Sequence, residues 1–295
     1  MEALDMVESI PLVSVVMINW NRKDILRHVL LKLAGQTYPR YEIIIADNGS
    51  TDGAAEMVET EFRQVKLIRL NENCGIKGYN IAFENSLGEI IVILDNDSFP
   101  EDEGIAKIVK KFQKYPKLGA LGSKVYYYYS GKIHHWHPHV RDEYGPDEGF
   151  DSPLFNGCSA AARSSVLKEV GFYPDEFFLY ENERDLCTRI INAGYDVKYF
   201  TDIAGYHMVS EESRSSERLI FYATRNRIWY CWKYLPIWIA CWKTMAIAGF
   251  NIIAAVKSMR IKLYLEPIFV GIMGLPGVLK KRRPVKKEYL QKILY

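Results

Sequence analysis

The chain has 295 residues, of which 48% are hydrophobic and 25% charged, and its formal net charge is +2. Its 20 tyrosines, 13 phenylalanines and 20 scattered glycines, together with the lack of heptad repeats, exclude a disordered chain, a collagen and a coiled coil. At roughly 150 residues per domain, the length allows one large or two ordinary domains.

The small net charge conceals an uneven distribution. Residues 218–295 hold 15 Lys and Arg side chains against Glu266 and Glu288, a net charge of +13, which leaves −11 for residues 1–217. An acidic N-terminal part and a basic C-terminal part suggest that the two parts bind different partners. We therefore predict two parts, residues 1–217 and residues 218–295.

Strands and helices alternate in the first 94 residues. Val13–Ile18 is a β-branched apolar run typical of a buried parallel strand, and Asp24–Leu33 follows with helical spacing of its apolar residues. The same alternation predicts strands at Glu42–Ala46, Val65–Arg69 and Ile90–Leu94. It predicts one helix that ends at Phe62 and another at Tyr79–Ser86. This pattern predicts an α/β fold with a largely parallel sheet.

Three polar clusters each follow a predicted strand directly: Asn19–Asn21, Asp47–Asp52 and Asp95–Asp97. In parallel α/β sheets, ligands bind beyond the carboxyl ends of the strands. We therefore expect the three clusters to meet at one crevice.

After Gly119 the alternation weakens. The patterns predict a mixed strand and helix half with elements at Val125–Tyr129, Asn156–Ala162, Arg163–Val170 and Asn182–Ala193. The polar stretch between Ser130 and Pro153, which includes four histidines, is long enough to be a lid or an acceptor loop.

The last quarter is basic and rich in aromatic residues. Four tryptophans fall within fourteen positions, and the longest uncharged runs, Thr244–Val256 and Pro267–Leu279, have thirteen residues each, short of the ~20 needed to cross a bilayer. Basic residues with interfacial aromatics favour helices that lie in the headgroup plane. The alternative is a soluble helical appendage with a solvated basic face.

A basic block at Lys280–Lys287 would add about 1 kcal/mol of attraction to anionic lipid per residue. No nucleic-acid-binding motif accompanies it, so we expect no nucleic acid partner.

Met1–Pro11 contains no long apolar run, which indicates that the chain begins in the cytosol. The five cysteines form no C-x-x-C pair and are expected to be reduced thiols. We therefore expect a peripheral protein on the cytoplasmic side of the cell membrane.

Asp95-Asn96-Asp97 places two carboxylates one residue apart at the end of an apolar strand. Such a pair suits a hard divalent cation, which takes oxygen ligands and can bridge substrate phosphates. The alternative is a helix start enriched in acidic residues.

Further motifs occur in a fixed order along the chain. Asn73–Asn80 opens a helix whose N-terminus can face an anion, Phe177–Cys187 follows, and His207 lies 24 positions after Glu183. The set also includes Gln36–Pro39, Asn156–Cys158 and Thr224–Arg227. In this order and spacing it resembles the family 2 glycosyltransferases, especially the bacterial rhamnosyltransferase-like branch that extends cell-surface polysaccharides.

The resemblance implies the GT-A nucleotide-sugar transferase fold for residues 1–217 and inversion at the anomeric carbon. The C-terminal membrane-associated helices are expected from composition, as described above. It implies that Asp47 pairs with the pyrimidine base of the donor. The nucleoside loop then comprises Asn73, Gly75, Gly78 and Asn80. Mg²⁺ or Mn²⁺ is held on the diphosphate by Asp95 and Asp97, and in some members by a histidine similar to His207, which is otherwise an ordinary histidine after a strand.

The resemblance also implies acceptor and leaving-group residues. Asn156 and Cys158 match the acceptor side, although Gly157-Cys158 fits close core packing equally well. Arg225 or Arg227 would support the diphosphate, or instead bind lipid phosphate.

The catalytic base departs from the family pattern, which usually reads Glu-Asp-x-Asp. Here Asn182-Glu183-Arg184-Asp185 puts Glu183 in the base position. Glu181 and Asp185 are the substitutes, although Asp185 fits a structural residue at the helix start better. A carboxylate is retained, so we predict an active enzyme.

The sequence thus predicts an inverting, metal-dependent glycosyltransferase that moves a sugar, with rhamnose first, from a dTDP- or UDP-sugar to a glycan or lipid-linked acceptor. One alternative is an idle nucleotide-sugar-binding or scaffold protein on the same fold. The other is a nucleotidyltransferase, whose glycine- and lysine-rich N-terminal signature is missing from this sequence.

Overall fold

The computed structural model describes residues 10–134, 149–208 and 216–294. Its strands are β1 (Val13–Asn19), β2 (Tyr41–Asp47), β3 (Lys66–Arg69), β4 (Ile90–Asp95), β5 (Ser98–Pro100), β6 (Leu118–Tyr127), β7 (Phe150–Asp151), β8 (Ala160–Arg163) and β9 (Asp196–His207). They form one sheet in the order β3-β2-β1-β4-β8-β6-β9-β5, and β7 pairs with β9.

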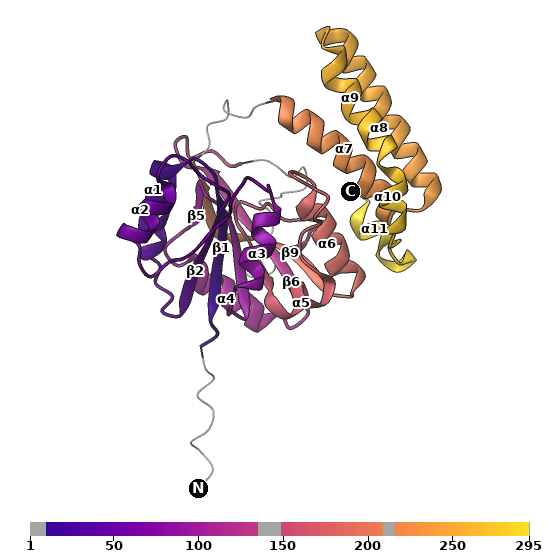
Figure 1. The fold of residues 1–295 in the computed structure, drawn as a ribbon. Coiled ribbons are helices and arrows are strands. Elements are labelled where there is room, and N and C mark those ends of the chain that lie inside the picture. Colours follow the sequence, from indigo (N-terminus) through magenta and orange to yellow (C-terminus); the bar gives the residue numbers. More distant parts are fainter. Residues whose placement is uncertain (1–9, 135–148, 209–215, 295) are drawn as a thin grey trace.

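Helices cover both faces of this sheet and form a separate layer at the C-terminal end (Figure 1). They are α1 (Lys23–Ala34), α2 (Ala54–Glu61), α3 (Lys77–Glu84), α4 (Gly104–Lys114), α5 (Ser164–Val170), α6 (Asn182–Asn192), α7 (Ser216–Tyr234), α8 (Ile237–Ser258), α9 (Ile261–Met273), α10 (Leu275–Lys280) and α11 (Leu290–Ile293).

The four strands β3, β2, β1 and β4 are parallel neighbours, as the alternation predicts. Their register places Asn19 beside Asp47 and Ile18 beside Asp95. The polar residues that follow β1, β2 and β4 therefore emerge together at one edge of the sheet, as we expect from the sequence.

Alternate residues of β1 point to opposite faces, and both faces are buried. Val16 packs into a core with residues of α3, α5 and α6, whereas Val15 and Met17 pack with residues of α1, α2 and α4. A strand buried on both sides has no polar face, which explains why its sequence is a continuous apolar run.

The second half of the sheet is mixed, because β8 runs antiparallel to β4 and β6 while β6 and β9 are parallel. Here the predictions miss α4 and β9 and start β6 seven residues late. The early part of β6 contains Gly119 and Gly122, and a Cβ at Gly119 would lie 2.7 Å from Ile190. This part of the strand is built for close approach of α6, so it lacks the β-branched residues by which strands are recognised.

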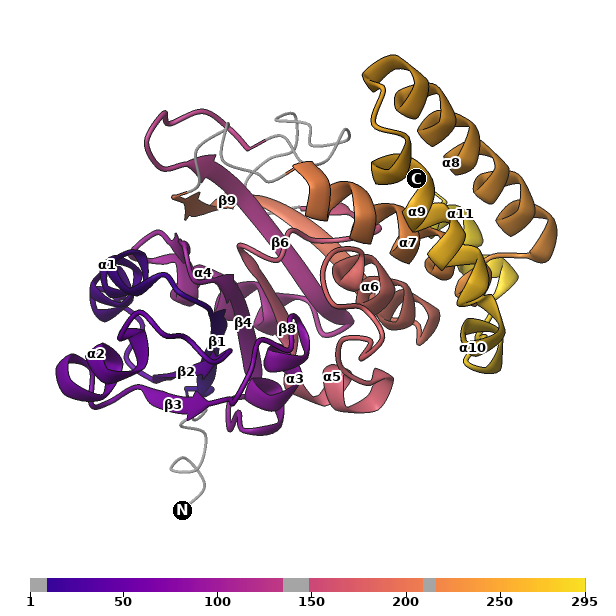
Figure 2. The same cartoon turned by 45° about the horizontal axis from the view of Figure 1, so that its top comes forward.

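The C-terminal helices pack against the sheet half of the molecule through α7 (Figure 2). Tyr230, Tyr234 and Leu235 belong to the same core as Phe177 and Ile190. Helix α7 begins two residues before the predicted boundary at residues 217/218. The division of the chain into residues 1–217 and 218–295 stays a prediction. One buried core contains residues from both parts.

Helix α8 is a long apolar helix with little cover. Among the described residues it alone is long and apolar enough to cross a membrane, by length and composition, with 22 residues, a mean hydropathy of 1.6 and 22% of its most apolar window buried. The uncharged runs underestimate its length because Lys243 lies within the helix. The helix is therefore longer than its uncharged runs, and attachment at the membrane surface stays a prediction.

Candidate active site

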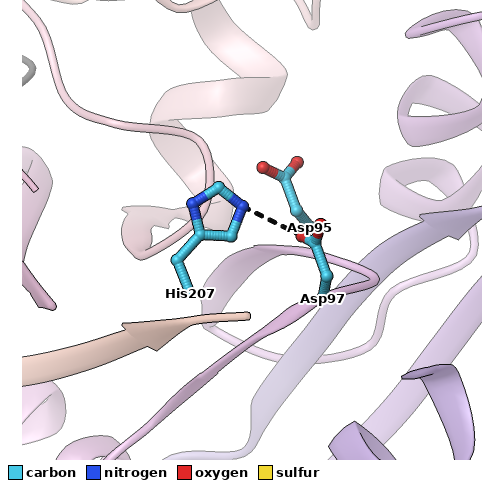
Figure 3. Close-up of side chains that lie close together, drawn as sticks. All are labelled: Asp95, Asp97 and His207. Atoms are coloured by element: carbon cyan, nitrogen blue, oxygen red, sulfur yellow. Dashed lines mark hydrogen bonds and ion pairs between the residues drawn. The ribbon is translucent and has the colours of Figure 1, made fainter. Parts of the chain in front are cut away.

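Two aspartates and a histidine meet at the edge of the sheet. Asp95 ends β4, Asp97 follows two residues later, and His207 ends β9. The β5–β9 pairing sets Ser98 opposite His207, which brings the histidine to the aspartates across 110 residues of chain. One ligand atom from each of the three lies within 4.8 Å of the others (Figure 3).

The carboxylate of Asp97 is buried between two nitrogen groups. Its Oδ1 lies 3.0 Å from Nε2 of His207, and its Oδ2 accepts a hydrogen bond from the guanidinium of Arg22. Burial acts to raise the pKa of Asp97, but the hydrogen bond and charge of His207, with the charge of Arg22, outweigh it and lower the pKa. Asp97 is therefore ionised at neutral pH.

This group of side chains fits a divalent cation. Two carboxylates and one imidazole are ligands for Mg²⁺ and Mn²⁺. Among the described residues, buried Nδ1 of His207 has no hydrogen-bond partner, whereas Nε2 of the same ring is engaged by an aspartate of this group. Asp95 and Asp97 would hold the ion, with Nε2 of His207 as the third ligand.

A cavity of about 410 Å³ opens in front of the three residues. It is lined by Ile18, Asn19, Trp20, Arg22, Asn48, Asn73, Gly75, Asp95, Asn96, Asp97, Phe178, Leu179, Tyr180, His207 and Arg218. Five of the predicted site residues therefore line it: Asn73, Gly75, Asp95, Asp97 and His207.

Gly75 brings the Asn73–Asn80 loop against Phe178. Its φ is +62°, and a Cβ there would lie 2.2 Å from the carbonyl oxygen of Phe178, which accepts a hydrogen bond from N of Ile76 at 3.0 Å. A glycine is therefore required where this loop meets the segment before α6.

Three residues predicted for the donor lie behind the cavity wall instead of lining it. The oxygens of Asp47 accept hydrogen bonds from Asn19 Nδ2 at 2.8 Å and from Ser50 N at 2.9 Å. Asn80 donates to the carbonyl of Tyr173, and Gly78 packs against Asn48. In the structure these residues shape the loops that line the cavity.

Arg225 also lies away from the cavity. Its guanidinium stacks 4.3 Å from the ring centroid of Trp229 and donates to Oδ1 of Asn226. Burial lowers the pKa of Arg225. The α7 cation that does line the cavity is Arg218, two turns earlier, which lies over the ring of Trp20.

Glu183 lies at the start of α6 with its carboxylate against Gly157. A Cβ at Gly157 would lie 2.5 Å from Oε1 of Glu183, so the glycine makes room for this carboxylate. Burial raises the pKa of Glu183 to about 7, and the charges of Asp95 and Glu181 add to the rise. A carboxylate with this pKa can accept a proton at neutral pH.

The segment before Glu183 is held in an uncommon backbone conformation. Tyr180 and Glu181 both have φ near +65°, at 65° and 63°. Nδ2 of Asn226, a fully buried residue of α7, donates to the carbonyls of Leu179 and Tyr180 at 2.7 and 2.9 Å. Strain of this kind persists where surrounding contacts enforce it, often at functional sites.

Asp185, the second candidate base, is fully buried and already engaged. Its oxygens lie 2.8 Å from Nε of Arg189, from Nζ of Lys233 and from the hydroxyl of Tyr234. The prediction that kept Asp185 as a possible base is not supported, because its carboxylate joins α6 to α7.

The predicted acceptor residues lie on the segment before β8. Asn156 Nδ2 lies 3.3 Å from Nδ1 of His134, whose ring centroid is 5.5 Å from that of His207. The side chain of Cys158 is buried. Residues 135–148, most of the predicted acceptor loop, lie outside the described residues.

Sequence reasoning missed Arg22 and Arg218 as cavity residues. Arg22 directly follows the Asn19–Asn21 cluster, so its position after β1 was a usable signal. Arg218 reaches the cavity because of how α7 packs, which no local pattern reveals.

Comparison with known proteins agrees with this fold. The chain is 28% identical over 202 residues to YfnE, an uncharacterized glycosyltransferase of Bacillus subtilis (strain 168); the match covers 66% of this chain and 49% of YfnE, so the chain spans about half the length of that relative.

Solved structures share the architecture. A mannosyltransferase, PcManGT from Pyrobaculum calidifontis in complex with GDP-Man and Mn²⁺, is similar with a TM-score of 0.57 and 21% identity, covering 74% of this chain and 62% of that one. GalNAc-T7 with UDP, GalNAc and Mn²⁺ is similar with a TM-score of 0.63 and 16% identity, covering 77% and 48%. The predicted GT-A fold is confirmed. The family model described as "Glycosyl transferase family 2" matches residues 14–171, more than half of the chain, and the chain belongs to this family.

Proposed function

We propose that this protein is an inverting glycosyltransferase that takes a sugar from a nucleotide-diphosphate donor with the help of Mg²⁺ or Mn²⁺. The observation that carries the proposal is the meeting of Asp95, Asp97 and His207 within 4.8 Å of one another at a 410 Å³ cavity. This group lies beyond the carboxyl ends of parallel strands, where ligands of α/β sheets bind.

The cavity residues suit a nucleoside diphosphate. A divalent cation held by Asp95, Asp97 and His207 supplies charge neutralisation for the diphosphate leaving group. Arg22 and Arg218 bring two guanidinium groups to the same cavity and bind phosphate oxygens. Asn48 and Asn73 offer amide groups that orient the nucleoside.

Glu183 acts as the base. Its carboxylate takes the proton from an acceptor hydroxyl as that oxygen attacks the anomeric carbon, and the bond to the diphosphate breaks on the opposite face. General base catalysis contributes typically 10²–10⁴-fold. The pKa of about 7 leaves a large ionised fraction at neutral pH.

The donor sugar and the acceptor are the finer part of the proposal. dTDP-rhamnose is the first donor to test because of the resemblance of the sequence motifs, followed by UDP- and GDP-sugars. The acceptor is a glycan or a lipid-linked glycan of a cell-surface polysaccharide.

We also propose peripheral attachment to the cytoplasmic face of the membrane. Large apolar side chains are exposed along α8 and α9, including Trp238, Trp242, Phe250 and Phe269 at 61% or more. Exposed aromatics beside lysines and arginines are typical of helices at the lipid headgroup level.

Calorimetry with a panel of nucleotide sugars, with and without Mn²⁺, tests the donor assignment. We expect one donor class to bind with Mn²⁺, and Asp97→Asn to weaken this binding at least 10-fold. Asp24→Asn is the matched control, since it makes the same change at a carboxylate on α1 that is 90% exposed.

Turnover with membrane extract as acceptor then separates an active enzyme from an idle binding protein. Donor binding without transfer in every extract would support the idle alternative. Failure of every nucleotide sugar to bind with Mn²⁺ would overturn the proposed function.

A further inference from the structure

A second cavity lies between α6, α7, α8 and α11, away from the donor cavity. Its volume is about 290 Å³, and it shares no lining residue with the cavity at Asp97. Three cations line it: Arg184 from α6, Arg227 from α7 and Lys243 from α8.

Two of these cations share one carboxylate. The two carboxylate oxygens of Glu181 pair with Nε of Arg184 at 2.8 Å and with Nε of Arg227 at 3.0 Å. Lys243 has no ion pair among the described residues. Arg227, whose side chain is 50% exposed, and Lys243 can therefore meet an anion that enters the cavity.

The rest of the lining is apolar. Tyr230, Cys231 and Leu235 form the buried wall, while Trp242, which is 61% exposed, stands on the α8 side. From Trp242 an apolar surface continues along α8 through Met245 and other exposed side chains. The cavity therefore has a cationic part and an apolar part that is continuous with an exposed apolar helix.

We propose that this cavity binds an amphiphile with a phosphate head and a hydrocarbon chain. The phosphate pairs with Arg227 and Lys243, and the chain leaves past Trp242 onto α8. Guanidinium and ammonium groups are the usual partners of phosphate oxygens. A volume of 290 Å³ suits a head and the first carbons, and the exposed apolar residues of α8 receive the rest.

The position of the cavity gives it a place in the reaction. Arg184 and Arg227 both hold Glu181, two residues before Glu183, so a lipid phosphate here is bound beside the segment that carries the base. This role rests on the proposed function: the bound lipid would be the carrier of the acceptor, anchored while its glycan reaches the donor cavity. A phospholipid of the bilayer offers the same head and chain.

Direct binding measurements on the full-length protein, without nucleotide sugar, test the proposal. The soluble probes are farnesyl phosphate, farnesol and inorganic phosphate, measured by calorimetry. We expect farnesyl phosphate to bind at least 10-fold more tightly than either part alone. The double variant Arg227→Ala/Lys243→Ala should lose at least 10-fold of this affinity.

Two further variants keep the test independent of misfolding. Lys257→Ala removes an exposed lysine from the same helix and should bind like wild type. Ala246→Phe fills the cavity, keeps all three cations, and should also weaken farnesyl phosphate binding. Each variant is accepted only if its melting temperature and its binding of nucleotide sugar with Mn²⁺ match wild type.

Flotation with phosphatidylglycerol vesicles separates the two sources of lipid phosphate. Farnesyl phosphate binding that depends on Arg227 and Lys243 supports an isoprenoid carrier, whereas vesicle binding alone that depends on them supports a bilayer phospholipid. Equal binding by wild type and the double variant in both assays overturns the site, as does inorganic phosphate that binds as tightly as farnesyl phosphate. None of these outcomes alters the donor calorimetry, so the proposed function fails or stands separately.

Discussion

Strand β1 and helix α8 are both apolar, but the molecule treats them differently. Six of the seven residues of β1 are buried, between helices on both faces of the sheet. In α8, exposed side chains include Trp238, Phe250 and Val256, with 70% or more of their surface accessible. The chain covers the first segment with its own helices on both faces, whereas within the described part of the chain α7 and α9 cover only part of the second.

The contrast shows that apolar composition has two uses in this protein. In β1 it builds the sheet whose end positions the acidic residues. In α8 it offers an apolar surface much larger than the isolated exposed residues normal on soluble proteins. We expect catalysis to depend on the first region and membrane contact on the second.

The largest expected effect is at the base. Glu183→Gln keeps the shape of the side chain but cannot accept the proton, so kcat should fall 10²–10⁴-fold. Single-turnover measurement of sugar transfer checks this. Donor affinity should stay within about twofold of wild type. Unchanged turnover would assign the base elsewhere.

The next effect concerns the uncovered helix. Phe250→Glu and Val256→Glu should each lower partitioning into anionic vesicles about 10–100-fold, because burial of a large apolar side chain is worth about 1.5–3 kcal/mol. Co-sedimentation with vesicles measures it. Leu87, 76% exposed in the sheet half, provides the control: Leu87→Glu should partition like wild type. An equal loss in both regions would remove the distinction.

Gly157 tests the position of the base without removing it. A methyl group there would contact Oε1 of Glu183, so Gly157→Ala should shift this carboxylate and lower kcat about 10-fold. The melting temperature should change little, since a flexible side chain can move aside. Gly277→Ala on α10, where nothing lies within 4 Å, is the matched control. Equal kcat in both variants would show that the carboxylate tolerates displacement.

The pKa of Glu183 sets a pH dependence. Because burial raises this pKa to about 7, the ionised base is lost as pH falls, and kcat should drop about 10-fold from pH 8 to pH 6. Measurement of kcat as a function of pH at constant ionic strength checks this. A midpoint near 4.5 would mean that the carboxylate is solvated during turnover.

The same raised pKa predicts a stability effect of opposite sign. The folded state holds the Glu183 proton more tightly than the unfolded chain, so its contribution to stability declines as pH rises from 4.5 to 7. Glu183→Gln should therefore raise the melting temperature at pH 8 more than at pH 5. A rise that is equal at both pH values would contradict the assignment.

The smallest expected effect is at Arg22, whose guanidinium competes with a bound metal ion for the carboxylate of Asp97. Arg22→Met should raise the affinity for Mn²⁺ without nucleotide threefold to tenfold, because the competing guanidinium is removed. Electron paramagnetic resonance of free Mn²⁺ measures it. Arg27→Met, on the exposed side of α1, should leave the affinity unchanged. Weaker Mn²⁺ binding in Arg22→Met would mean that Arg22 supports the ion.

The sequence predicted the parts of the fold that rest on continuous apolar runs. β1, β2 and β4 are buried on both faces, so their composition alone marks them. Strand β9 escaped prediction because Asp196, Lys198 and Asp202 interrupt it, and its pairing with β6 is set by the rest of the sheet. The hydrophobic pattern of a segment does not reveal a strand whose pairing is decided by its neighbouring strands.

For the site, residues at strand ends were predictable and residues brought by packing were not. Asp95 and Asp97 follow directly from the end of β4. Glu183 and Asp185 are two residues apart on one helix start, and only the packing of α6 shows that Asp185 turns toward α7. Arg218 enters the cavity from a helix far along the chain.

The interactions of the Asp185 carboxylate determine where the chain can be shortened without a large loss of stability. Its partners Lys233 and Tyr234 lie at the end of α7, so a fragment that stops at residue 217 would lose two of its three partners, and a fragment cut just before Lys233 would lose them while keeping most of the cover over the charge. Breaking a buried pair in this way costs about 3–5 kcal/mol, a large share of the stability of a domain. Soluble fragments for crystallisation should therefore keep α7 entire and be trimmed, if at all, beyond Tyr234.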